Sequence, residues 1–270
     1  MWEVRRALPF AGGTALAVAA GITLSAFAGA GPACAQDVPP RLACPAGQAA
    51  PPQATVVNRP TAPSCSVANL LRSASVRPAG RGLTVSVRRR RASRVTVSVF
   101  QTASTRAVLG ERLVFRTTAR QSAVRWAGRR QARRATPSDG VFFVRVSARA
   151  GSAVDTRRFA LRRTRGRFTV LRTFARRDGC ADLRSFKVER PAFGGRGSRA
   201  VGVSFRIARD ARVTVELRRG GRTVRRLTRS ARRAGVLHRL RIAPERLPRG
   251  RYEVRLRFGT TTASLFVERI

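Results

Sequence analysis

The sequence predicts an all-β protein of two tandem antiparallel β-sandwiches that follow a signal peptide and a proline-rich linker. Many short segments alternate apolar and polar residues with a period of two, which is the pattern of half-buried antiparallel strands. No segment shows a competing 3.6-residue apolar period. The alternating pattern occurs twice, about 115 residues apart, and this spacing fits one sandwich domain for each copy.

The N-terminus predicts export. Arg5 and Arg6 precede a weakly apolar stretch rich in alanine and glycine, and Ala33-Cys34-Ala35 forms a small-residue cleavage pattern before Gln36. We therefore expect a signal peptide over residues 1–35. The competing interpretation is an uncleaved signal anchor, because residues 7–30 are long enough to span a bilayer.

Residues 36–65 form a linker between the signal and the first sandwich. This stretch holds seven prolines and has no apolar periodicity. Such a composition cannot bury a core and favours an extended, semi-rigid spacer.

The first sandwich is expected over residues 66–165. Its alternating segments place one set of apolar residues on the buried face of each strand: Leu83, Val85, Val87, Val95, Val97, Val99, Phe142, Val144, Val146, Phe159 and Leu161. Polar residues between them, such as Thr84 and Arg145, then face solvent.

The second sandwich, residues 178–270, repeats the pattern of the first. At an offset of 118, Leu83 corresponds to Val201, and the four residues starting at Arg94 are identical to the four starting at Arg212. At an offset of 110, Gly140 corresponds to Gly250. Residues 166–177 are expected to be a basic connector, or to extend a terminal strand.

The segments around Trp126 and Gly140 carry a resemblance to a known family. Trp126 and Gly128, then Pro137, Ser138 and Gly140, and the return strand "RRFALRR" resemble the bacterial immunoglobulin-like domain of the flagellar hook-capping type. Ala127 stands where that family prefers aspartate, and the second copy has Leu237-His238 at the position of the tryptophan turn. The resemblance implies an immunoglobulin-like or fibronectin-III-like sandwich that serves as a spacer or binding accessory without catalytic residues.

The charge of the chain is extreme. It has 56 Lys+Arg against 13 Asp+Glu, a net charge of +43, and Lys187 is its only lysine. The first sandwich holds 24 basic and 3 acidic residues and the second 24 and 8, so the excess covers both domains. A surface of this kind attracts polyanions. A GC-rich genome would explain the preference for arginine over lysine, but explains the shortage of acidic residues less well.

Two arginine clusters in loops and at strand ends are the predicted polyanion-binding residues, because guanidinium groups fork onto phosphate or carboxylate. They comprise Arg88, Arg89, Arg90 and Arg91, and Arg129, Arg130, Arg133 and Arg134. The alternative is a solvated basic face without a ligand. Sequence-specific nucleic-acid binding is not expected, since there is no recognition helix and only Phe143 and Phe100 are expected as exposed aromatics.

The sequence predicts no enzyme, metal site or cofactor. His238 is the only histidine, and its alternating context indicates a half-buried structural residue. A hydrolase built on His238 is the alternative, but no nucleophile-elbow sequence supports it. The cysteines lack the spacing of a zinc site.

The mature chain has three cysteines, so one is left unpaired. A seven-strand sandwich places its two ends at opposite poles, which would separate Cys65 from Cys180. We therefore expect a Cys44–Cys65 disulfide and a free Cys180.

Together these features predict an exported, non-catalytic structural or adhesive protein at the cell envelope, attached electrostatically to an anionic polymer. A dedicated polyanion- or nucleic-acid-binding protein, and an accessory domain pair of a secreted hydrolase system, are the alternatives. A membrane is a partner only if the N-terminal segment stays uncleaved.

Overall fold

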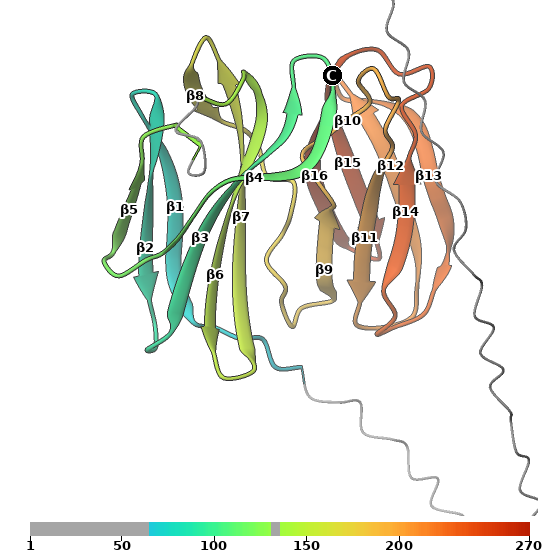
Figure 1. Ribbon diagram of the computed structural model, residues 1–270. Helices are drawn as coiled ribbons and strands as arrows, with labels where there is room; N and C mark the ends of the chain where they lie inside the picture. Colours follow the sequence, from blue (N-terminus) through green and yellow to red (C-terminus); the bar gives the residue numbers. More distant parts are fainter. Residues whose placement is uncertain (1–64, 131–135) are drawn as a thin grey trace, which may run out of the picture. The chain divides into compact units, whose positions relative to one another are not determined.

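Sixteen β-strands and the loops between them make up residues 65–130 and 136–270, the part of the chain that the computed structural model describes (Figure 1). The expected signal peptide and most of the linker lie outside these residues. The first eight strands are β1 (Leu71–Ala79), β2 (Gly82–Arg89), β3 (Arg94–Ser104), β4 (Val108–Thr118), β5 (Ala123–Trp126), β6 (Gly140–Ala150), β7 (Ala153–Thr164) and β8 (Arg167–Val170). The others are β9 (Leu183–Val188), β10 (Ala192–Phe193), β11 (Val201–Ile207), β12 (Ala211–Arg219), β13 (Arg222–Arg232), β14 (His238–Ile242), β15 (Gly250–Phe258) and β16 (Thr261–Arg269).

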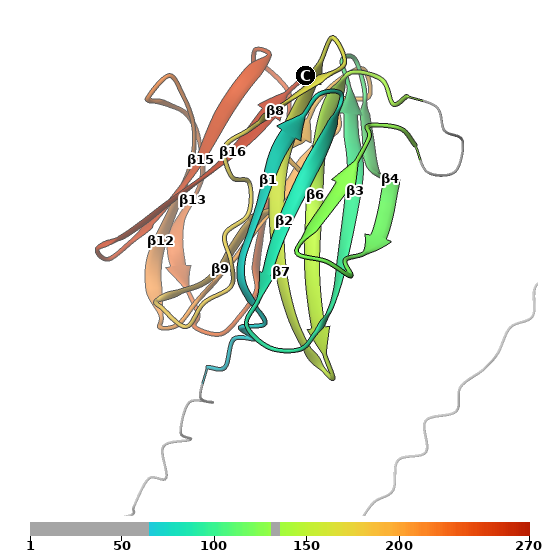
Figure 2. The ribbon, with the colours of Figure 1, turned by 90° about the vertical axis from the view of Figure 1, so that its left-hand side faces the viewer.

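Strands β1 to β8 form the first sheet pair. A three-stranded sheet has the order β1-β2-β5, and a five-stranded sheet has the order β4-β3-β6-β7-β8. All their pairings are antiparallel. Apolar side chains from both sheets form one core, and in Figure 2 strands β1 and β2 lie in front of β6 and β7.

Strands β9 to β16 form the second sheet pair. Its three-stranded sheet has the order β14-β11-β9, and its five-stranded sheet has the order β10-β16-β15-β12-β13. The short strand β10 runs parallel to β16, whereas the other pairings are antiparallel.

The prediction of an all-β chain with antiparallel sheets is confirmed, and so is the predicted alternation. Every apolar residue expected to face inward in the first pair is buried except Phe159, which is half-buried and packs against the same core. In the second pair Val201, Val203 and Phe205 of β11 are equally buried. Strands such as β2 and β11 therefore bury one face, because alternate side chains point to opposite sides of the sheet.

The turn after β5 needs both of the residues singled out in the sequence. Trp126 is buried and donates its indole N–H to the carbonyl of Arg129 at 2.7 Å. Its ring packs against Phe115 and Phe168. Gly128 has a φ of 79°, and a Cβ on it would lie 2.1 Å from the carbonyl oxygen of Arg81.

Gly128→Ala should lower the free energy of unfolding by about 2–3 kcal/mol, because a left-handed φ and a steric clash act together. Gly80→Ala is the matched control, since Gly80 also has a positive φ but a Cβ there would meet no atom within 4 Å. Only the cost of the backbone conformation, about 1 kcal/mol, remains in the control. Urea unfolding of both variants measures the difference, and equal losses would show that the clash is absent.

The predicted disulfide is wrong. Cys65 is bonded to Cys180, with their Cα atoms 5.6 Å apart, so Cys180 is not the free cysteine and Cys44 is not the partner of Cys65. The cause lies in the expected connector, residues 166–177. Its β8 turns back and pairs antiparallel with β7, and this extra reversal returns the chain to the pole where β1 begins.

Within residues 65–130 and 136–270 the structure contains no helix long and apolar enough to cross a membrane.

Candidate anion-binding surface

The first predicted arginine cluster lies at the end of β2. Arg88 and Arg89 are its last two residues, and Arg90 and Arg91 follow in the turn to β3. All four side chains are exposed. The guanidinium of Arg89 donates to the carbonyl of Ala119, so this arginine also has a structural contact.

The second predicted cluster follows β5, at the opposite end of the same sheet. Arg129 is exposed and Arg130 is half-buried, with a hydrogen bond to the Gln101 side chain at 3.4 Å. Arg133 and Arg134 lie outside the described residues. Because the turn at Gly128 packs against the start of β2, roughly 20 Å of strand separate the two clusters. The structure does not join them into one surface.

Many outward arginines of the second five-stranded sheet are paired with carboxylates. Glu216 contacts Arg226 and Arg257, and Glu268 contacts Arg162 and Arg251. Glu216 and Glu268 are themselves buried. Each of these carboxylates therefore offsets part of the arginine charge from within the fold.

Glu253 is the third carboxylate of that face. Burial alone would raise its pKa, but hydrogen bonds from Ser264 at 2.5 Å and Arg255 at 2.9 Å, with the charges of Arg255 and Arg218, hold the pKa below the ordinary value of 4.5. The folded state therefore favours the ionised carboxylate.

A depressed folded pKa stabilises the protein above the unfolded pKa, and this contribution is lost as the pH falls through the folded value. The stability of wild type relative to Glu253→Gln should therefore decline as the pH falls below the ordinary value of 4.5. Thermal unfolding above and below this pH measures the difference in melting temperature between the two proteins. A difference that stays constant with pH would contradict the assignment.

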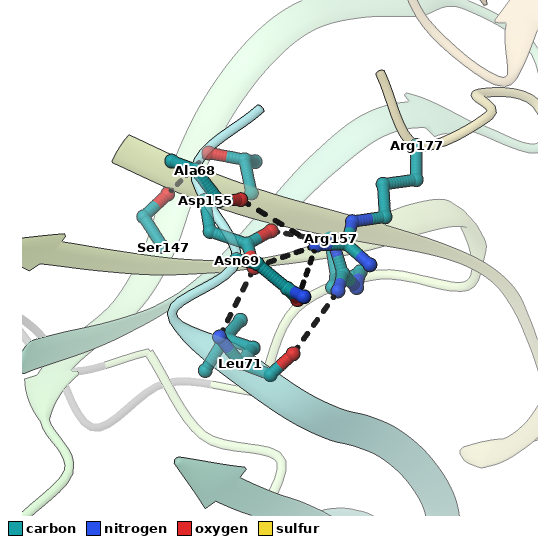
Figure 3. Close-up of polar contacts among 8 residues, drawn as sticks. Ala68, Asn69, Leu71, Ser147, Asp155, Arg157 and Arg177 are labelled. Carbon is teal, nitrogen blue, oxygen red and sulfur yellow. Dashed lines mark hydrogen bonds and ion pairs between the residues drawn. The ribbon is translucent and has the colours of Figure 1, made fainter. Parts of the chain in front are cut away.

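The carboxylate of Asp155 ties three segments of the first sheet pair together (Figure 3). It is buried, and it accepts hydrogen bonds from the backbone N–H of Leu71 at 3.0 Å and from Arg157 at 2.5 Å. Arg177 contacts the same carboxylate at 3.4 Å and Asn69 at 2.7 Å. The cluster joins the start of β1, strand β7 and the segment before Cys180.

Both guanidiniums of this cluster contact the Asp155 carboxylate. Burial lowers the pKa of the Arg157 guanidinium, Asp155 opposes that effect, and the neighbouring Arg177 adds to it. Since one carboxylate holds two guanidiniums, the cluster is a cross-link of the fold rather than a free binding site.

A different pair of arginines lies on the outer face of the first five-stranded sheet, the face turned away from its core. Arg145 on β6 and Arg158 on β7 are directly opposite each other in the strand register. Their guanidiniums lie over the ring of Phe143, at 5.4 Å and 6.0 Å, and Arg145 also lies 4.7 Å from the Phe100 ring centroid. Both side chains are half-buried.

This pair is only partly neutralised. Burial is the main cause that lowers the pKa of the Arg158 guanidinium, and the charge of Arg145 lowers it further, whereas the charges of Glu111 and Asp178 raise it. Arg145 has an exposed ion pair with Glu111 at 2.6 Å. No carboxylate among residues 65–130 and 136–270 forms an ion pair with Arg158.

Phe143 and Phe100 correct another prediction. Both were expected to be exposed, but Phe143 is fully buried and Phe100 is 5% exposed. Their rings stack at 4.8 Å and join the apolar cluster of the second sheet pair. Both rings are buried beneath the arginine guanidiniums and are not available for stacking nucleobases.

The remaining candidate from the sequence is His238. It is half-buried at the start of β14, where its ring packs against Phe205 at 5.1 Å and its Nε2 lies 2.9 Å from the carbonyl oxygen of Arg233. Within the described residues no three histidine, cysteine or acidic side chains gather as metal ligands.

No protein-family model matches the chain, and the curated proteins contain no match to it.

Proposed function

We propose that this chain is an exported, non-catalytic protein of the cell envelope, built of two tandem immunoglobulin-like domains and held by electrostatic contact with an anionic polymer. The observation that carries the proposal is the excess of arginine on a folded surface where most of the carboxylates already contact an arginine. Asp155, Glu216, Glu253 and Glu268 all contact arginines, yet a net charge of +43 remains.

The strand order supports two copies of one domain. The sequence of strands β4-β3-β6-β7 in the first pair corresponds to β13-β12-β15-β16 in the second, and β1-β2-β5 corresponds to β9-β11-β14. The extra strand at the equivalent edge differs, because β8 follows β7 whereas β10 lies between β9 and β11.

Tyr252 supports the immunoglobulin-like assignment. It is buried near the start of β15, and its hydroxyl donates to the carbonyl of Pro248 at 2.5 Å. A tyrosine near the start of this strand that bonds to the backbone a few residues upstream is a hallmark of the fold. Phe142 occupies the corresponding place in β6 and has no hydroxyl to make the bond.

Export is supported by the Cys65–Cys180 disulfide, since disulfides persist in oxidising compartments outside the cytosol. The cleavage pattern before Gln36 fits the same compartment.

Cell fractionation tests the proposal. The protein should sediment with the envelope and be released by about 0.5–1 M salt, because electrostatic contacts are screened at that ionic strength. Release only by detergent would mean that the N-terminal segment is an anchor, and recovery in the cytosolic fraction would refute export.

A further inference from the structure

We propose that the outer face of the first five-stranded sheet binds a linear acidic polysaccharide through its carboxylates and hydroxyls. This inference rests on the proposed attachment to an anionic polymer and adds the residues and the class of polymer. The face is defined here by eight side chains on β3, β4, β6 and β7: Thr96, Ser98, Arg116, Thr118, Arg145, Ser147, Thr156 and Arg158.

The strand register arranges these side chains in two rows that cross the sheet. One row is Arg116, Ser98, Arg145 and Arg158, and the next row is Thr118, Thr96, Ser147 and Thr156. The rows are two residues apart along each strand, or about 7 Å. Six of these side chains, with Arg94 and Arg149 beyond the hydroxyl row, line one open groove. The other two, Thr156 and Arg158, line a second cavity on the β7 side.

The two opposed arginines indicate an anion. Like charges directly opposite each other across two strands destabilise a sheet, and Arg145 opposite Arg158 is such a pair. A carboxylate placed between them would remove the repulsion and form charge-assisted hydrogen bonds, which are among the strongest in proteins. The Nε of Arg145 is buried and makes no hydrogen bond with the described residues.

In the second sheet pair, the arginine at the corresponding position has a neighbouring carboxylate and no opposing arginine. Arg255 occupies the place of Arg145 but faces Ser264, and Glu253 accepts hydrogen bonds from both of them. In the first pair, among the residues that the structure describes, the only carboxylate that forms an ion pair with Arg145 is the exposed Glu111. An exposed ion pair contributes about 0–1 kcal/mol, so a ligand carboxylate can replace Glu111 at little cost.

The row of hydroxyls favours a polysaccharide over a nucleic acid. Each serine or threonine hydroxyl both donates and accepts, which suits the hydroxyl groups of a sugar chain. Single-stranded nucleic acids are bound by exposed aromatic rings that stack on the bases. The rings on this face, Phe100 and Phe143, are buried beneath the arginines.

A pair of variants with equal charge tests the site. Arg145→Gln/Arg158→Gln should weaken binding of polygalacturonate, a carboxylate-bearing polysaccharide, at least about tenfold at 0.15 M salt, because charge-assisted hydrogen bonds are lost. The control Arg222→Gln/Arg229→Gln removes two exposed charges from β13 and should weaken it less than about threefold. Calorimetric titration measures both.

A charge-neutral variant separates the hydroxyls from the charge. The side-chain hydroxyl of Thr96 makes no hydrogen bond with the described residues, so Thr96→Val leaves the fold intact while it removes a donor to the sugar. It should weaken polygalacturonate binding about three- to tenfold and leave the binding of polyphosphate unchanged. Thermal unfolding checks that each variant is folded. If Arg145→Gln/Arg158→Gln is unfolded, the affinity of Thr96→Val for polygalacturonate still tests the site.

The outcomes distinguish this inference from the proposed function. If wild type binds neither polygalacturonate nor polyphosphate, attachment to an anionic polymer is refuted. If both double variants lose affinity equally, non-specific attachment stands and the site is refuted. The choice of a polysaccharide is refuted if Arg145→Gln/Arg158→Gln weakens the binding of polyphosphate or single-stranded DNA as strongly as the binding of polygalacturonate. It is also refuted if Thr96→Val leaves the affinity for polygalacturonate unchanged.

Discussion

Cys180→Ser should lower the free energy of unfolding by about 4–5 kcal/mol. The Cys65–Cys180 bond spans 115 residues of sequence, and in the chain-entropy description a cross-link that closes a loop of this length removes that much freedom from the unfolded chain. Urea unfolding of the oxidised wild type and the variant measures the loss, and wild type under a reducing agent should fall to the same value.

Cys44→Ser is the control, because Cys65 is already bonded to Cys180, so loss of the Cys44 thiol should leave the unfolding midpoint unchanged. Mass spectrometry after thiol blocking gives an independent answer, since Cys65 and Cys180 should be recovered as one linked peptide pair. A linked Cys44–Cys65 peptide would restore the original sequence-based pairing and remove the explanation for the Cys180→Ser effect.

Local sequence pattern was sufficient to locate strands such as β2, β3 and β6. The alternation in β2, β3 and β6 depends only on which side of a strand each residue occupies, so it identifies the buried set without knowledge of the fold. The disulfide was mispredicted because the ends of a domain depend on the number of chain reversals. The turn at Arg165 and Gly166, where Arg165 has a φ of 49°, adds one reversal through β8.

The binding surface was harder to predict because it depends on the register between strands. Alternation places Arg145 on the outer face, but its opposition to Arg158 requires the two-residue turn at Gly151 and Ser152, where Ala150 pairs with Ala153. Two-residue hairpins fix the register of their strands, so this turn is the signal that was available. Runs of consecutive arginines instead indicate strand ends and loops, where Arg88 and Arg89 are exposed at the end of β2.

Asp155→Asn should lower the free energy of unfolding by about 3–5 kcal/mol, because removal of one partner from a buried ion pair leaves the other charge uncompensated. The Arg157 side chain is only 15% exposed and the Asp155 side chain 2%. Asparagine keeps the size of the side chain and can still accept from the N–H of Leu71, so the loss reports mainly the charge. Urea unfolding at neutral pH measures it.

Asp182→Asn is the matched control for this effect. Its partner Arg209 lies at 2.8 Å, but the two side chains are 41% and 65% exposed, and such pairs contribute about 0–1 kcal/mol. Equal losses in the two variants would show that burial of Asp155 has no energetic consequence. Adding Arg157→Gln to Asp155→Asn should cost less than the sum of the single changes, because the second substitution removes the charge that the first left unpaired.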